Sequence, residues 1–182
     1  GSLKEMLEGL FTYTKLQGGR YEIERTACRL NRILKETLFS YYEEWLALGI
    51  RPEFCIPEEE ICVEADPRAL RRVIQNLIKN GMDHGEKKIR IALKRQGDRA
   101  VMTFANQVSC PDKIDTEHVF DRFYKADEAR SRTSTGLGLS IARELARRME
   151  GDIAARMEAD WFVAEVQLAA LPCGAKGYTE DV

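Results

Sequence analysis

The sequence has no long apolar run, and this absence excludes a membrane-spanning helix within its 182 residues. Such a helix needs roughly 20 consecutive apolar residues, and no signal peptide is visible either. With 44% hydrophobic and 32% charged residues, we expect one good-sized domain with a charged surface and room for a piece of another. Gly1 and Ser2 resemble a remnant of an expression vector, so we expect the natural chain to extend further upstream.

A strong charge of one sign and paired cysteines are also missing. The formal net charge of −2 argues against a general nucleic-acid binder, because recognition of the phosphate backbone depends on a basic surface. The five cysteines include no CxxC pair, so we expect reduced thiols and neither a zinc site nor a disulfide framework. Histidine is scarce, since only His84 and His118 are present.

One stretch organises the chain, a helix that is predicted to begin at a capping Asp66 followed by Pro67. Its core stripe consists of apolar residues at helical spacing: Leu70, Val73, Ile74, Leu77 and Ile78. Asn76 and Asn80 share a face beside this stripe, with Asp83 one turn on. Their amide oxygens suit a hard cation such as Mg²⁺ on a nucleotide. The alternative is an ordinary amphipathic helix with two solvated amides.

Apolar periodicity predicts the remaining elements. Helices are expected over residues 3–14, 28–48 and 139–149. Strands are expected over residues 21–26, 50–56, 60–64, 88–95, 100–105, 153–157 and 162–168. This mixed order predicts an α+β fold, a two-layer α/β sandwich in which a mixed, mostly antiparallel sheet has helices on one face.

Residues 106–135 lack sustained periodicity, apart from a short helical patch at 115–119. A loop of this length is uncommon in a compact domain unless it is a functional lid, and the alternative is a solvated charged loop. Gly136 and Gly138 follow the loop and open a helix, where glycines let the backbone approach a ligand and free N–H groups favour phosphate. The alternative here is a flexible hinge.

Three short motifs, in this order, resemble the boxes of one ATP-binding domain. Residues 76–85 (NLIKNGMDHG) resemble the N box of the sensor histidine kinases, residues 120–124 (FDRFY) their F box, and residues 135–139 (TGLGL) their G2 box. The resemblance extends from the first helix to about Leu171. It implies the Bergerat ATP-binding fold.

The resemblance also implies a division of the chain. Residues 20–171 would form the catalytic ATP-binding domain, and residues 172–182 a flexible tail. Residues 1–19 would be the C-terminal stub of the dimerisation and histidine-phosphotransfer helix, whose cut bundle would leave an apolar stripe exposed. The alternative for this helix is an ordinary part of the globular core.

Residue roles at an ATP site follow from the resemblance. Asn80 would hold Mg²⁺ and act with Arg122 in catalysis, and the lid residues Arg122 and Lys125 would offset the charge of the phosphates. The residues implied to bind ATP are Asn76, Asn80, His84, Asn106, Arg122, Lys125, Thr135, Gly136, Leu137 and Gly138. An ordinary histidine at the end of a helix is the alternative for His84.

Two positions depart from the family's pattern. The family usually has Asp-x-Gly-x-Gly after the hairpin, whereas Asn106 takes the place of the Asp here and both glycines are missing. Asn106 still offers an acceptor to the adenine amino group, but a neutral one, and charge-assisted hydrogen bonds are stronger. Asp83 stands where a basic residue is common, and its carboxylate would repel phosphates unless it reaches the metal. His118 does not resemble the phosphoacceptor histidine, whose helix would lie upstream.

For the whole protein, the resemblance implies a homodimeric, membrane-bound sensor kinase with this part in the cytoplasm. It would transfer the γ-phosphate of ATP to a histidine of its own phosphotransfer domain and then to a response regulator, without a nucleic-acid partner. One alternative is a degenerate, non-catalytic nucleotide-binding or dimerisation module, which Asn106 and Asp83 favour. Another is a serine kinase or a further ATPase of the same fold.

Overall fold

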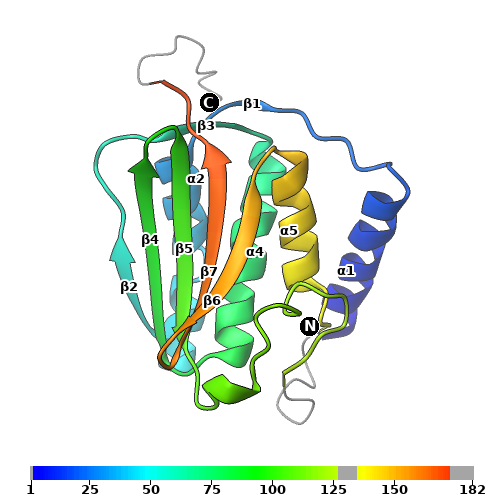
Figure 1. Cartoon of the computed structure of the whole chain (residues 1–182), viewed down its shortest axis with the longest axis vertical. Helices are drawn as coiled ribbons and strands as arrows, with labels where there is room; N and C mark the ends of the chain where they lie inside the picture. The colour runs from blue at the N-terminus through cyan, green and yellow to red at the C-terminus, as the bar shows by residue number, and fades with distance from the viewer. Residues whose placement is uncertain (1, 127–134, 173–182) are drawn as a thin grey trace.

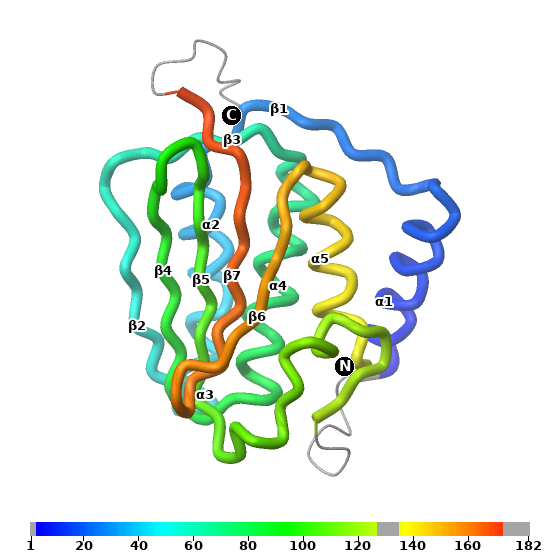
Figure 2. Tube along the Cα trace, viewed as in Figure 1, coloured from blue at the N-terminus to red at the C-terminus, as the bar shows by residue number. Residues whose placement is uncertain are grey.

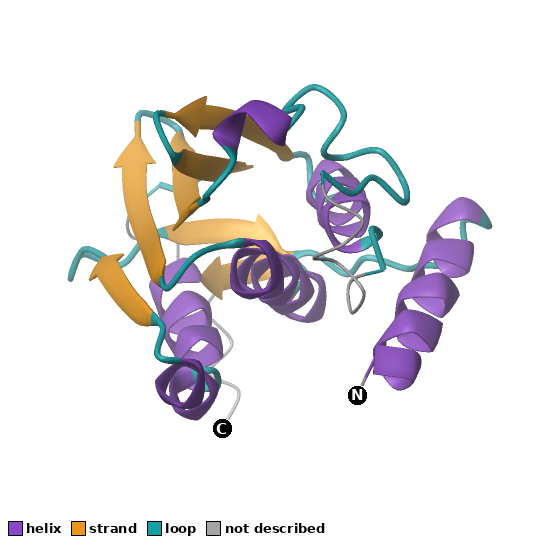
Figure 3. Cartoon of the chain, turned by 90° about the horizontal axis from the view of Figure 1, so that it is seen from below, coloured by secondary structure: helices purple, strands orange, loops and turns teal. Residues whose placement is uncertain are grey.

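The computed structural model describes residues 2–126 and 135–172, and its elements form two layers (Figures 1 and 3). The helices are α1 (Ser2–Gln17), α2 (Leu30–Phe39), α3 (Tyr42–Leu48), α4 (Pro67–His84), the 3-10 helix η1 (Pro111–Lys113) and α5 (Gly138–Arg148). The strands are β1 (Thr26–Arg29), β2 (Arg51–Cys55), β3 (Cys62–Ala65), β4 (Lys88–Gln96), β5 (Arg99–Gln107), β6 (Asp152–Glu158) and β7 (Trp161–Ala169). Among these described residues, no helix is both long enough and apolar enough to cross a membrane.

The main sheet of the described chain has the strand order β2-β4-β5-β7-β6. Strand β2 runs parallel to β4, and the other neighbours are antiparallel. Strands β1 and β3 pair separately as a small antiparallel sheet. Helices α2, α4 and α5 cover one face of the main sheet (Figure 1), while the other face has charged side chains such as Arg90 and Glu53, which form an ion pair at 2.9 Å. The predicted α+β sandwich is therefore confirmed.

The covered face of the sheet and the helices share one hydrophobic core. In β4, Ile89 and Ile91 are buried while Arg90 between them is exposed, which is the alternation that the sequence shows. Ile91 lies opposite the buried Phe104 of β5. The apolar stripe of α4 is at most 3% exposed at every position: Leu70, Val73, Ile74, Leu77 and Ile78. Burial of this stripe fixes α4 against the sheet.

Helix α4 begins where the sequence predicts. Asp66 has an extended backbone, and its Oδ1 accepts hydrogen bonds from the N–H groups of Arg68 (2.9 Å) and Ala69 (3.2 Å). Its Oδ2 accepts a third hydrogen bond from the N–H of Glu24 at 3.0 Å, which ties the segment before β1 to the helix. Pro67 takes the first helical position, where its missing N–H leaves no intrahelical bond unmade.

The single helix predicted over residues 28–48 is wrong, because the structure has two helices there, α2 and α3. The Ser40 hydroxyl donates to the carbonyl of Thr37 at 2.6 Å, and such side-chain bonds compete with the hydrogen bonds of a helix. Tyr41 lies between the two helices and stacks on Trp45 in the core, with ring centroids 6.1 Å apart. Tertiary packing of these two rings therefore overrides the continuous apolar pattern.

The strand predicted over residues 21–26 is mostly wrong. Strand β1 begins only at Thr26, because residues 26–29 are the part that finds a partner in β3. Tyr21 and Ile23 are half-buried and pack against the core from an irregular segment. The alternation of apolar and polar residues over 21–26 thus reflects packing of the apolar side chains on the core, although no neighbouring strand pairs with this segment.

The helical patch predicted at residues 115–119 is a run of turns, and the helical residues nearby are those of η1. The Asp115 Oδ1 accepts a hydrogen bond from the N–H of Glu117 at 3.0 Å, a local bond that favours a turn over a helix. The predicted flexible tail lies outside the described residues from Cys173 onward.

Helix α1 lies against α5 at the far side of the molecule from β2 (Figure 2). Thr12 and Leu16 are buried on one side, and the Arg148 Nη2 of α5 donates to the carbonyl of Leu16 at 2.7 Å. Near its start, Glu5 pairs with Lys79 of α4 at 2.7 Å. The outer side of α1 leaves large apolar side chains exposed: Leu3, Met6, Leu7, Leu10 and Phe11.

We expect Asp66→Ala to destabilise the domain by about 1–2 kcal/mol, because it removes the cap of α4 and the hydrogen bond to Glu24 together. Urea denaturation followed by circular dichroism measures the change. The matched control is Asp112→Ala, since Asp112 is exposed. Equal stability of the two variants would contradict the structural role of Asp66.

Candidate functional site

One side chain joins α4 to the start of α5. The Asn76 Nδ2 donates to the backbone carbonyl of Gly138 at 3.1 Å, which holds the glycine-rich loop against α4. Asn80 lies one turn further along the same face of the helix and is half-buried. The two amides that the sequence singles out therefore lie on one edge of α4, and the first of them anchors the loop.

The two glycines of this loop have different surroundings. Gly136 has a φ of +69°, and a Cβ there would lie 2.7 Å from the Cα of Phe123. The N–H of Phe123 donates to the carbonyl of Gly136 at 2.9 Å, so the F-box part of the predicted lid is bonded to the residue that follows the lid. A Cβ at Gly138 would meet nothing within 4 Å. The backbone thus requires Gly136, whereas Gly138 has open space beside it at the N-terminus of α5.

Thr135 and Leu137 shape the loop just before α5. The Thr135 Oγ1 accepts a hydrogen bond from the N–H of Leu137 at 3.3 Å. The Leu137 side chain is 1% exposed in the core, and its carbonyl accepts the N–H of Ile141 at 3.0 Å as the helix begins. The N–H groups of the first turn of α5 have no partners inside the helix and give this end a partial positive charge. They suit an anionic ligand beside Gly138.

At the other end of α4, Asn106 is buried against two glycines. It lies near the end of β5 opposite Ile89 and Phe162 and is 4% exposed. A Cβ on Gly85 would lie 2.9 Å from both the Cβ and the Nδ2 of Asn106, and a Cβ on Gly81 would lie 3.5 Å from its Oδ1. A side chain at position 85 would therefore clash with this amide, whereas a Cβ at position 81 would make an ordinary van der Waals contact with it.

The amide of Asn106 is not fully satisfied by the protein. Its Nδ2 has no hydrogen-bond partner among the described residues. Asn31, the other buried asparagine of this part of the chain, differs in this respect. Its Nδ2 donates to the carbonyls of Pro57 (2.8 Å) and Glu59 (2.9 Å), and its Oδ1 accepts the N–H of Ile61 (2.9 Å). Asn31 is therefore a structural asparagine, while Asn106 keeps a donor free for a ligand.

His84 lies at the exposed end of α4, close enough to Lys125 of the lid for the two charges to interact. Neighbouring protein atoms desolvate the ring and lower the pKa of His84; Asp83 opposes this shift, and Lys125 adds to it. Desolvation also raises the pKa of the exposed Asp83 carboxyl. The structure thus places Lys125 within electrostatic reach of His84 at the end of α4, with the predicted phosphate-repelling Asp83 next to His84.

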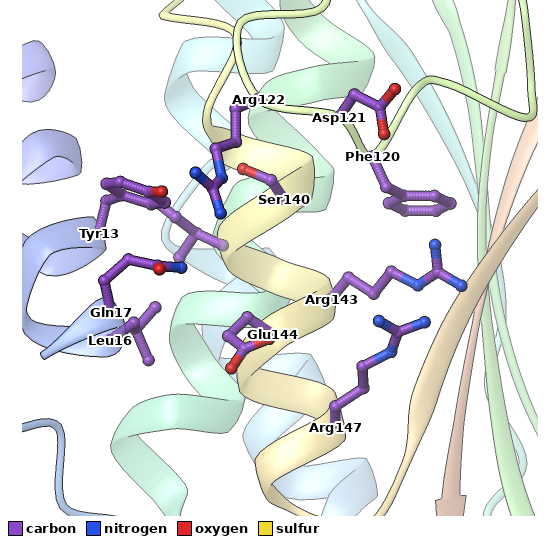
Figure 4. A pocket seen from close by; sticks show the side chains of 11 residues that line it. Tyr13, Leu16, Gln17, Phe120, Asp121, Arg122, Ser140, Arg143, Glu144 and Arg147 are labelled. Carbon is purple, nitrogen blue, oxygen red and sulfur yellow. The ribbon is translucent and has the colours of Figure 1, made fainter. Parts of the chain in front are cut away.

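Arg122 points toward α1. Its guanidinium lies 4.8 Å from the centre of the Tyr13 ring, in a cleft of about 370 Å³ between α1, α5 and the F-box segment (Figure 4). Arg143 of α5 lies 4.8 Å from the Phe120 ring in the same cleft. The structure therefore groups Arg122 with the α1 contact, apart from the asparagines that face the glycine-rich loop.

His118 is exposed and pairs with Asp115 at 2.7 Å, a hydrogen bond that raises the pKa of His118. Three further polar residues of the loop, Arg130, Arg132 and Ser134, lie outside the described residues.

Sequence reasoning missed the part that Gly81 and Gly85 play. A signal was available, because glycine inside a helix costs about 1 kcal/mol relative to alanine and Gly81 lies in the last full turn of α4. Its use became visible only with Asn106 packed beside it. The two ends of the site are then Asn76 and the glycines at positions 81 and 85. They are five and nine residues apart, which corresponds to about 7.5–13.5 Å along a helix.

Comparison with known proteins agrees with this geometry. A family described as histidine kinase-, DNA gyrase B-, and HSP90-like ATPase matches residues 65–170. The sensor histidine kinase YcbM of Bacillus subtilis is 29% identical over 155 residues, covering 83% of this chain and 50% of the relative. The sensor protein VanS of Enterococcus faecium is 30% identical over 175 residues, covering 93% of this chain and 45% of VanS. The chain spans about half the length of these curated relatives.

Solved structures share the fold. The histidine kinase AdeS of Acinetobacter baumannii superposes with a TM-score of 0.75 at 15% identity, covering 93% of this chain and 79% of the other. The histidine kinase ThkA, in complex with the response regulator TrrA, gives a TM-score of 0.73 at 22% identity, covering 93% of this chain and 49% of the ThkA chain. Since the family match spans more than half of the sequence, the chain belongs to the histidine kinase-, DNA gyrase B- and HSP90-like ATPase family, as an ATP-binding catalytic domain of the sensor histidine kinase type.

Proposed function

We propose that the domain binds ATP with Mg²⁺ along α4 and donates the γ-phosphoryl group to a histidine of a dimerisation and phosphotransfer domain. The observation that carries this proposal is that two features lie along one side of α4, one beside Asn76 and the other beside its C-terminal end. Asn76 holds a glycine loop with open space at Gly138, and Asn106 keeps a buried amide donor unpaired at the other end. The first feature suits phosphates, and the second suits the edge of a base.

The phosphate end is formed by the N-terminus of α5. Its first N–H groups are fixed in direction, because Leu137 is buried and Asn76 bonds the backbone of Gly138. Such a terminus stabilises negative charge without having to reorganise when the ligand arrives. The absence of a side chain at Gly138 lets the phosphates approach this backbone closely.

Asn80 is the residue that we assign to Mg²⁺. Its amide oxygen is a hard, neutral ligand, which suits an ion that keeps several waters and binds mainly to phosphate oxygens. A bound Mg²⁺ would neutralise part of the negative charge on the phosphates. Asn80 would position that charge beside the loop anchored by Asn76, one turn away.

The lid would complete the site from the side of His84. Lys125 lies within electrostatic reach of His84, and the bond between Phe123 and Gly136 fixes the F-box part of the lid just before α5. A cation there would offset charge on the phosphates. Arg122 would reach the phosphates only by leaving Tyr13, so its catalytic role requires the lid to move relative to α1.

In the transfer, a ring nitrogen of the accepting histidine would bond to the γ-phosphorus while the bond from that phosphorus to the bridging oxygen breaks and ADP leaves. Phosphoryl transfer of this kind depends mainly on positioning and on neutralising charge, which is what the residues along α4 supply. The phosphohistidine would then serve a response regulator. The similar fold of ThkA in its complex with TrrA supports this choice of partner.

We assign residues 1–19 to the last helix of the dimerisation and phosphotransfer domain, residues 20–171 to the catalytic domain and residues 172–182 to a tail. The exposed apolar side of α1 supports the first assignment, because such a stripe suits the interior of a helical bundle between two copies. The whole protein would be a homodimeric, membrane-bound sensor with this domain in the cytoplasm.

A non-catalytic module of the same fold is the second candidate, and Asp83 and Asn106 favour it. Asp83 places a carboxylate near His84 and Lys79, and Asn106 lacks the charge of the usual Asp. Calorimetry with ATP, with and without Mg²⁺, separates the candidates: binding that Mg²⁺ strengthens supports the kinase, and no binding supports the non-catalytic module.

Asn80→Ala should abolish the Mg²⁺-dependent part of ATP binding, which we expect to lower the affinity roughly tenfold or more. Because Asn80 is only half-buried and Ala favours a helix, the melting temperature without ligand should change little. Calorimetry and thermal melts measure the two effects. Gln75→Ala, at an exposed amide of the same helix, is the control. Unchanged Mg-ATP binding by Asn80→Ala would refute the metal assignment.

Gly138→Ala and Gly136→Ala should separate binding from folding. Gly138→Ala should keep or raise the melting temperature while weakening ATP binding, because its Cβ occupies the open space beside the phosphates. Gly136→Ala should lower stability by about 1–2 kcal/mol, since its φ is positive and its Cβ meets the backbone of Phe123. If Gly138→Ala bound ATP as tightly as the unaltered chain, the assignment of the phosphates to the N-terminus of α5 would be wrong.

The chain should not label itself with γ-labelled ATP, because neither His84 nor His118 is assigned as an acceptor. Supplied with a phosphotransfer domain from the same protein, it should label that domain with the acid-labile, base-stable chemistry of phosphohistidine. Filter assays and a histidine-to-alanine acceptor control measure the transfer. Stable self-labelling at His84 or His118 would contradict the proposal.

A further inference from the structure

We propose that the base end of the site accepts a 6-oxopurine nucleotide about as well as a 6-aminopurine one, because Asn106 reads ring position 6 with an amide. This inference rests on the proposed function, since it assumes that a purine nucleotide lies along α4. It adds a substrate class, inosine and guanosine triphosphates, to the ATP of the family. The residue that decides it is Asn106.

The chemistry of the two possible side chains differs in one respect. A carboxylate only accepts hydrogen bonds, so an Asp pairs with the amino group of adenine and repels the carbonyl oxygen of a 6-oxopurine. An amide has one accepting oxygen and one donating nitrogen, and a half-turn of its terminal torsion exchanges them. Asn106 can therefore meet either an amino group or a carbonyl.

The packing around Asn106 leaves this choice to the ligand. Its Nδ2 has no hydrogen-bond partner among the described residues, although the side chain is only 4% exposed. The orientation of Asn31, by contrast, is fixed by three hydrogen bonds to the backbone. A buried amide donor without a partner is costly, and a carbonyl oxygen at position 6 would remove that cost.

The backbone of Gly85 lies close beside the amide. Gly85 has no side chain to cover Asn106, since a Cβ there would lie 2.9 Å from the Nδ2 and 2.4 Å from the carbonyl of Gly81. The carbonyl of Gly81 accepts the N–H of Gly85 at 2.9 Å and no hydrogen bond from Asn106. The base is the partner that we assign to the Asn106 amide, at the end of α4.

The test compares ATP with ITP, because inosine differs from adenosine at position 6 and in the proton on the adjacent ring nitrogen. Calorimetry with Mg²⁺ gives both dissociation constants for the unaltered chain, for Asn106→Asp and for Asn106→Leu. We expect the unaltered chain to bind the two within about tenfold of each other. Asn106→Asp should raise the preference for ATP by roughly tenfold or more, since the carboxylate repels the oxygen at position 6.

Asn106→Asp buries a charge that could destabilise the fold, and Asn106→Leu is the uncharged control for this effect. Thermal melts of each variant measure the stability directly. It removes donor and acceptor together, so it should weaken both nucleotides and leave them equal within about threefold. GTP then tests whether the 2-amino group is accepted as well. GTP binding within about tenfold of ITP extends the substrate class to guanosine, and exclusion of GTP alone overturns that extension.

The possible failures are distinguishable. If the unaltered chain bound neither ATP nor ITP, the proposed function itself would be wrong. If it bound ATP but excluded ITP by more than about a hundredfold, the function would stand and the inference about Asn106 would be overturned. An unchanged ATP-to-ITP ratio in both variants would likewise overturn it, because position 6 would then be read by another residue.

Discussion

Burial of one side of α4 is the constraint on which the rest of the structure depends. Five aliphatic side chains of this helix are almost completely removed from water, and each contributes roughly 1.5–3 kcal/mol. Because these side chains fix the rotation of the helix about its axis, they also fix the direction in which its polar edge faces. Asn76 and Asn80 then lie on the edge that Asn76 joins to Gly138, and the end of the helix closes over Asn106.

The buried polar groups divide into two kinds on this frame. Asp66 and Asn31 have hydrogen-bond partners from the backbone and hold segments together, since Asp66 caps α4 and Asn31 secures the loop before β3. Asn106 has an unpaired donor at a position where two glycines make room for it. Among the described residues, Trp45 and Arg72 also have a buried nitrogen without a partner, but only Asn106 lies at the position that the family uses for the base, where a ligand could complete it.

The F-box segment links this site to α1 over a few residues. Phe120 packs under Arg143, Arg122 lies over the Tyr13 ring of α1, and the next residue, Phe123, is bonded to the glycine loop. Lys125 then lies near the end of α4. Residues 120–125 therefore contact α1 and α5 and come within electrostatic reach of the end of α4, so a change in the position of α1 would act on this segment directly.

The sequence alone determined the features that depend on neighbours in the chain. The cap at Asp66, the stripe of α4 and the alternation of β4 could be predicted, because periods of 3.6 and 2 reflect which face is buried. The break at Ser40, the contact of Arg122 with α1 and the fit of Gly85 against Asn106 were decided only by the tertiary structure. They join residues distant in the chain or compete with local pattern, and no spacing in the sequence encodes which surfaces will meet.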